Sequence, residues 1–231
     1  GFTLVFAEST SLSTKDDGER YGRRAALLIR GPAAPYDITD TRNSTCAFLM
    51  ASGRWVERLV PIDNGNKHII VACLYGYPRT KANTNTKLSN EALLSAAIVR
   101  MDQFQNLPYY LCTDLNDDPR DSDVACRAME NDMVRDIPSD WCNCDNLPNT
   151  FCRDNVFEGM TGKDISRIDT IFGNMVAAHG CTGVEYLWQD GAGFDHVPIR
   201  AYIRASAFDE SITTITKPVF LDLPVKPKNK G

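Results

Sequence analysis

The sequence contains no run of 18 or more apolar residues, the length expected of a helix that crosses a bilayer. Its first ten residues, GFTLVFAEST, lack the basic region and the cleavage site of a secretory signal peptide. Both absences argue against a membrane-bound or secreted protein. We therefore expect an intracellular chain, nuclear or cytoplasmic, with no membrane partner.

The sequence also lacks an excess of basic residues, with 25 Lys and Arg against 30 Asp and Glu and a net charge of −5. A protein that coats nucleic acid is usually basic. An enzyme can be acidic overall when its carboxylates hold a divalent cation, because the loaded site becomes locally positive. The charge balance therefore weakens the prediction of a simple binding module more than that of an enzyme.

Histidine is scarce, with three residues, whereas cysteine is not, with eight. The number of cysteines is even, but their spacing is not that of a small disulfide scaffold, which favours free thiols in a reducing compartment. A zinc site formed by Cys142, Cys144 and Cys152 is an alternative that the sequence leaves open, although no second cysteine pair follows at finger spacing.

Short apolar runs bounded by turn residues predict strands, because they are rich in β-branched and aromatic residues. The run HIIVACLYGY is almost unbroken, which is typical of a strand buried on both faces. The predicted strands cover residues 24–30, 55–62, 68–77, 108–113, 169–172 and 197–203.

Helical periodicity predicts a helix at residues 87–104, capped by Ser89 or Asn90, and a second at 122–135, capped by Ser122. Residues 136–154 are expected to form a loop. Helices placed between buried strands predict a mixed α/β domain. We expect this domain to cover residues 1–209 and a proline-containing, basic tail or linker to cover residues 210–231.

Two polar clusters lie beside predicted strands. Asp114 and Asn116 follow the strand at 108–113, and their spacing puts them on one face of an extended chain. A simple Asx-rich turn is the alternative interpretation of this cluster. Asp169 begins a later strand, where a charge is costly without a partner, and a surface ion pair with Arg167 is the alternative there.

A third cluster, Asp195-His196-Val197-Pro198, precedes the last predicted strand. A histidine beside a carboxylate is the usual general acid or base near neutral pH. A lone histidine is more often structural, so the functional interpretation of His196 depends on the other two clusters.

The ordered set of a D-x-N, an S-R-I-D and a D-H-x-P motif, each beside a strand, resembles the endonuclease/exonuclease/phosphatase family over about residues 20–204. This family includes abasic-site endonucleases, deoxyribonuclease I-like nucleases, inositol phosphatases and retrotransposon endonuclease domains. The resemblance implies an α/β fold in which two packed mixed β-sheets are covered by helices, a four-layer sandwich. It also implies a Mg²⁺ cofactor, with Mn²⁺ as the second choice.

The resemblance implies a role for each motif residue. Asp114 would activate the attacking water, and Asn116 would position that water or the phosphate. His196 would face the phosphate, with its tautomer and charge held by Asp169. Asp195 would bind the metal or assist the leaving group.

The resemblance also implies a tyrosine that contacts the scissile phosphate at the end of the strand at 68–77. Tyr75 is the first candidate, and Tyr77 is the second because Y-G-Y-P leaves the register open. Arg167 would order its loop rather than touch substrate.

The sequence departs from the family at three places. The family's first strand carries an asparagine and its second ends in a metal-binding glutamate, and neither strand is evident here, so we expect an N-terminally truncated fold. Glu8, after FTLVFA, is the one nearby candidate for the metal-binding glutamate. Thr113 stands where the family usually has glycine, and Phe194 stands where it usually has serine.

The resemblance favours a metal-dependent endonuclease that hydrolyses nucleic-acid phosphodiesters, with DNA as the favoured substrate. A retroelement origin would give the basic tail a following domain in a longer polyprotein. A phosphatase or phosphodiesterase for inositol or lipid headgroups is one alternative. A catalytically inactive family fragment is another, supported by the missing N-terminal motifs and opposed by the intact later ones.

Overall fold

A five-stranded mixed sheet forms the centre of the computed structural model, which describes residues 2–7, 25–31, 34–78, 83–142, 147–152, 165–188 and 195–209. Strands β4 and β5 are parallel, and the other neighbouring strands of this sheet are antiparallel. In sheet order the strands are β3 (Trp55–Ile62), β4 (Lys67–Tyr75), β5 (Tyr109–Asp114), β9 (Asp169–Gly173) and β6 (Arg135–Asp136).

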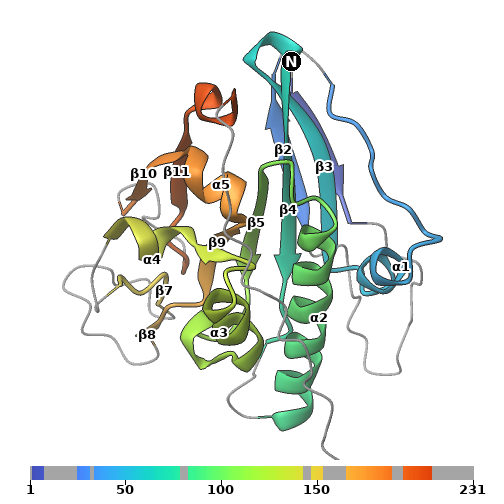
Figure 1. The fold of residues 1–231 in the computed structure, drawn as a ribbon. Helices are drawn as coiled ribbons and strands as arrows, with labels where there is room; N and C mark the ends of the chain where they lie inside the picture. The colour runs from blue at the N-terminus through green and yellow to red at the C-terminus, as the bar shows by residue number, and fades with distance from the viewer. Residues whose placement is uncertain are drawn as a thin grey trace, which may run out of the picture.

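Three helices cover one face of this sheet: α1 (Ser44–Ala51), α2 (Thr84–Asp102) and α3 (Asp123–Glu130). Figure 1 shows α2 running alongside β4. Apolar side chains of all three helices pack with the sheet in one buried cluster. This cluster includes Leu49 of α1, Leu94 and Ala97 of α2, Ala125 of α3 and Leu111 of β5.

The opposite face of the sheet is covered by two antiparallel strand pairs. The pair of β1 (Phe2–Phe6) and β2 (Ala26–Arg30) packs against β3 and β4, and the pair of β10 (Cys181–Tyr186) and β11 (Ile199–Ile203) packs near β5 and β9. Helices α4 (Ile137–Cys142) and α5 (Met175–Gly180) pack in the same buried cluster as β10 and β11. The predicted α/β fold of packed sheets covered by helices is confirmed, with the second layer divided into these two pairs.

The strand at 55–62 has the predicted bounds, and the other predicted strands match to within a few residues. The predicted cap of the long helix was wrong. Helix α2 begins at Thr84, because the Asn83 side chain accepts hydrogen bonds from the first free backbone N–H groups. Asn90 lies inside the helix and is buried. The Ser122 cap of α3 is confirmed by its hydrogen bond from the Ala125 N–H.

The prediction of a loop at 136–154 was wrong, because this stretch contains α4 and strand β7 (Phe151–Cys152), which pairs with β8 (Ile165–Ser166). The predicted helix at 122–135 ends at Glu130, and its last predicted residue, Arg135, begins β6. These short elements have little intrinsic preference and are fixed by packing on the sheet. None of the described helices combines the length and the apolar character needed to cross a membrane.

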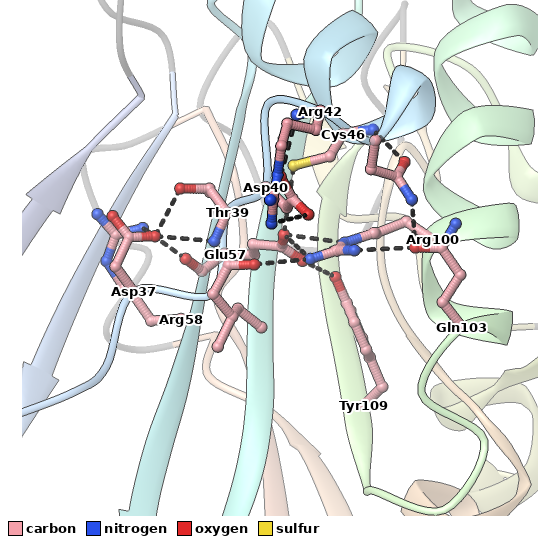
Figure 2. Close-up of polar contacts among 12 residues, drawn as sticks. Asp37, Thr39, Asp40, Arg42, Cys46, Glu57, Arg58, Arg100, Gln103 and Tyr109 are labelled. Atoms are coloured by element: carbon pink, nitrogen blue, oxygen red, sulfur yellow. Dashed lines mark hydrogen bonds and ion pairs between the residues drawn. The ribbon is translucent and has the colours of Figure 1, made fainter.

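A buried ion pair joins α2 to the sheet (Figure 2). The Arg100 guanidinium lies 2.8 Å from the carboxylate of Glu57, whose side chain is fully buried in β3. Tyr109 of β5 donates a hydrogen bond to the same carboxylate at 2.7 Å, and Arg100 also donates to the Ile38 carbonyl. A buried carboxylate is tolerated only with such partners, so this network fixes how α2 lies on the sheet.

Candidate active site

Three residues of the predicted site lie side by side at one edge of the central sheet. Asp114 ends β5, and its register partners are Tyr75 on β4 and Asp169 on β9. Residues directly opposite one another on neighbouring strands point to the same face of a sheet. The strand register therefore brings together three side chains that are far apart in the sequence.

His196 joins this edge from the segment that precedes β11. Its Nδ1 lies 2.9 Å from Oδ2 of Asp169. The imidazole also makes an edge-on contact with the ring of Phe151, at 5.1 Å between ring centroids, and the two residues form an isolated β-bridge. The histidine is thus held on one side by a carboxylate and on another by an aromatic ring.

Arg167 does not form the surface pair with Asp169 that was the alternative interpretation of its motif. Its side chain is buried, and it donates to both carboxylate oxygens of Asp136, at 2.6 and 2.7 Å. Thr170 also donates to Asp136. The arginine therefore orders the strand entrance from inside the protein, and this leaves the Asp169 carboxylate to His196.

Asp114, Asp169 and His196 each offer a potential ligand atom, and these atoms all lie within 4.8 Å of one another. Among the described residues, this is the one such group of three or more acidic, histidine or cysteine side chains. Asp195 is outside the group, and its side chain is exposed. Glu8 lies outside the described residues, as does Cys144 of the alternative zinc site.

The electrostatics of this group favour a bound cation. Burial and the nearby charge of Asp169 raise the pKa of Asp114 to about 6. The hydrogen bond with Asp169 raises the pKa of His196 to about 9, against the opposing effect of burial. Two carboxylates held close together in a partly buried site repel each other, and a divalent cation would relieve that repulsion.

The donor set fits a small hard cation, because carboxylate oxygens are the ligands of Mg²⁺ and Mn²⁺, and an imidazole nitrogen is acceptable to Mn²⁺. Asp114 and Asp169 could hold such an ion, with His196 either as a third ligand or free to face substrate. The side chains that meet at this edge can therefore bind a metal, take up a proton and present a positive charge.

Asn116 lies in a turn directly after β5. Its backbone N–H donates to the Asp114 carboxylate at 3.0 Å, so the Asx turn proposed as the alternative for this motif is present as well as the shared edge. The residue has a φ of 53°, a left-handed conformation that asparagine adopts more readily than most residues. Its side-chain amide donates to the Gly76 carbonyl at 3.3 Å.

The two candidate tyrosines pack against different buried clusters. Tyr75 is in register with Asp114 and packs against the cluster that contains Ala7 and Leu27. Tyr77 instead packs against the helix-side cluster. The strand register therefore favours Tyr75 as the tyrosine on the face of Asp114.

Thr150 is a site residue that the sequence did not reveal. Its side chain is fully buried, and its hydroxyl accepts hydrogen bonds from the N–H groups of Ile168 and Asp169. Its carbonyl accepts from the Val197 N–H at 2.7 Å. Thr150 thus links the strand of Asp169 to the segment of His196. It lies in a stretch predicted to be a loop and has no sequence motif that could have identified it.

No protein-family model and no curated protein matches the chain. Among solved structures, the chain is similar to an AP endonuclease from Archaeoglobus fulgidus, with a TM-score of 0.55 and 16% identity over 88% of this chain and 79% of that one. This likeness shows a shared fold, and it confirms the fold that the sequence resemblance implied.

Two further solved structures match less closely. A mannosyl-6-phosphatase from Bacteroides thetaiotaomicron has a TM-score of 0.47 and 16% identity over 65% of this chain. A 3'-5' exonuclease from Neisseria meningitidis has a TM-score of 0.45 and 17% identity, also over 65% of this chain. The chain spans 56% of the phosphatase and 64% of the exonuclease, less than two thirds of either protein.

Proposed function

We propose that the chain is a metal-dependent phosphoesterase that hydrolyses phosphodiester bonds in nucleic acid, with DNA as the favoured substrate. The observation that carries the proposal is the group of Asp114, Asp169 and His196, whose potential ligand atoms lie within 4.8 Å of one another. It lies at the edge of a sheet whose fold is shared with an AP endonuclease. The order of the motifs in the sequence supports the same assignment.

Each residue of the group has a chemical task in this proposal. Asp114, with a pKa near 6, is mostly ionised at neutral pH and can accept a proton from the attacking water. Asn116 positions that water or a phosphate oxygen. His196, with a pKa near 9, is protonated at neutral pH and presents a positive charge to the phosphate. Asp169 holds the imidazole in place at 2.9 Å.

A divalent cation, Mg²⁺ or Mn²⁺, bound beside Asp114 and Asp169 would polarise the phosphoryl oxygens and stabilise the leaving oxygen. We propose Asp195 and Glu8 as its ligands. Asp195 adds negative charge near Asp114 and His196, which supports a place close to the ion. Glu8 directly follows Ala7, whose buried side chain lies in the cluster against which Tyr75 packs.

We propose that Tyr75 hydrogen-bonds the scissile phosphate through its phenol. Its place on the face of Asp114 supports this role. The net charge of −5 predicts weak non-specific affinity for DNA. Substrate selection would then depend on contacts near the site rather than on a broad basic surface.

The first test is the nicking of supercoiled plasmid by the purified chain with Mg²⁺, with Mn²⁺ and with EDTA. We expect nicking that requires the metal and is lost in His196→Ala. The control His179→Ala changes an exposed histidine in α5 and should keep full activity. Nicking that survives EDTA, or that His196→Ala retains, would refute the proposed site.

The same preparations should be tested on inositol phosphates and on phospholipid headgroups. Hydrolysis of these compounds without any nicking would replace the nucleic-acid proposal with the alternative phosphatase. A folded chain that binds no Mn²⁺ and hydrolyses none of the substrates would support the inactive fragment.

A further inference from the structure

Two backbone segments at the site edge are tied together by one side chain of α2. The first segment, residues 75–77, begins at Tyr75, the last residue of β4. The second, residues 114–116, begins at Asp114, the last residue of β5, and carries Asn116. The Asn90 side-chain oxygen accepts a hydrogen bond from the Tyr77 N–H at 2.6 Å. Its amide nitrogen donates to the carbonyls of Tyr77 at 3.2 Å and Leu115 at 2.7 Å.

Asparagine is uncommon at a buried position inside a helix, which is where Asn90 lies. Its side chain is 7% exposed, and it lies in the middle of a long helix, where asparagine has a low preference. Both N–H groups of its amide and its carbonyl oxygen are used in bonds to the two segments. The side-chain hydrogen bonds of this helical asparagine all go to groups outside the helix. Its presence is therefore explained by the two segments that it binds rather than by helix propensity.

The backbones of the two segments are also in close contact. The Gly76 N–H donates to the Asp114 carbonyl at 2.6 Å, and a Cβ added at Gly76 would lie 2.5 Å from the Leu115 carbonyl oxygen. Arg54 also binds the first segment, because its guanidinium donates to the Gly76 carbonyl at 2.7 Å. Any shift of one segment is therefore transmitted to the other.

We propose that Asn90 is a positioning residue for hydrolysis, which fixes the segment of Asp114 and Asn116 relative to the segment of Tyr75. This inference rests on the proposed function. Asn90 touches no reacting atom and acts through the Leu115 carbonyl and the Tyr77 peptide. Reactions that depend on oriented groups lose about 100-fold in rate from a misplacement of about 1 Å, so a small relaxation of this clamp should be visible in kcat.

The test is Asn90→Asp, which keeps the side-chain shape and the acceptor but replaces the donor with an oxygen that faces two carbonyls. The matched control is Asn174→Asp. Asn174 is 6% exposed and likewise bonds only backbone groups with both ends of its amide, but it lies at the opposite end of β5 and β9. Both variants should lower the melting temperature, because both place a carboxylate against buried carbonyls.

We expect Asn90→Asp to lower kcat on bis(p-nitrophenyl) phosphate with Mg²⁺ by about 10- to 100-fold, with KM changed by less than about 3-fold. Asn174→Asp should keep kcat within about 2-fold of the wild type at temperatures where both variants are folded. Equal losses of kcat in the two variants, in proportion to their melting temperatures, would overturn the inference.

Amide hydrogen exchange separates this inference from the proposed function. In Asn90→Asp, exchange at the Gly76 and Leu115 amides should become at least about 10-fold faster than in Asn174→Asp, because these amides lie in the released segments. A wild-type chain that hydrolyses no phosphoester would refute the proposed function. The exchange rates would then decide alone, and equal protection of Gly76 and Leu115 in both variants would refute the clamp.

Discussion

Replacement of Asp169 by asparagine should lower the pKa of His196, so that the imidazole is mostly uncharged at neutral pH. In the wild type the hydrogen bond at 2.9 Å and the charge of Asp169 are the effects that raise the pKa of His196 to about 9 most strongly. Asparagine keeps the shape of the side chain and removes its charge. Burial then acts against the remaining charges of Asp114 and Asp195, so we expect the pKa to return to about 6.5.

This change has a definite size at pH 7.5. A histidine with a pKa of about 9 is more than about 90% protonated there, whereas one with a pKa of about 6.5 is about 10% protonated. If the imidazolium faces the phosphate, the alkaline limb of the rate profile should move from about pH 9 toward pH 6.5. The loss of rate in Asp169→Asn should therefore be larger at pH 8 than at pH 6.

The free energy of unfolding should depend on pH in the same direction as the charge of His196. A group whose pKa is raised on folding stabilises the protein fully below its unfolded pKa, near 6.5, and loses this contribution as the pH rises through about 9. The difference in unfolding free energy between the wild type and Asp169→Asn should shrink across that window. Urea unfolding of the metal-free proteins at pH 6 and pH 9.5 would measure it.

The direct assay is an NMR titration of the imidazole in EDTA, from pH 5.5 to pH 10. The chain has three histidines, so the spectrum of His196→Gln assigns the signal. A pKa that stays above about 8 in Asp169→Asn would refute the reasoning. It would mean that the other carboxylates, and not Asp169, hold the charge on the imidazole.

Three further predictions concern the site and its support. Asp114→Asn should abolish activity and stabilise the metal-free protein above pH 6 by about 1–2 kcal/mol. The raised pKa of Asp114 means that the folded state favours the uncharged side chain, and an unchanged melting temperature in EDTA would contradict this. Gly76→Ala should lower kcat by at least about 10-fold, because the added Cβ would lie 2.5 Å from the Leu115 carbonyl oxygen in the turn after β5. Wild-type kinetics in this variant would show that the turn can move without loss of rate. Arg100→Leu should cost about 3–5 kcal/mol in urea unfolding, because it leaves Glu57 buried without a cation. The exposed Arg42→Leu should leave the unfolding free energy nearly unchanged, and similar losses in the two variants would mean that the buried network contributes little to stability.

The sequence by itself determined the strands that cross the core and the motifs at their ends. The unbroken apolar run of β4 and the alternation in β3 follow from local residue types, so their bounds were readable. Asp114, Asp169 and His196 were found because each stands beside such a strand. Their common edge was expected only through the resemblance to a family, since nothing local specifies which strands become neighbours.

The tertiary structure decided the pairings among polar side chains. Arg167 lies two residues from Asp169 but pairs with Asp136, and Asn90 has the type of a helix cap but binds two loops. Thr150 holds the His196 segment from a stretch that has no periodic pattern. A buried polar group must find its hydrogen-bond partner wherever the fold places one, and that partner is distant in sequence, so local propensity cannot identify it.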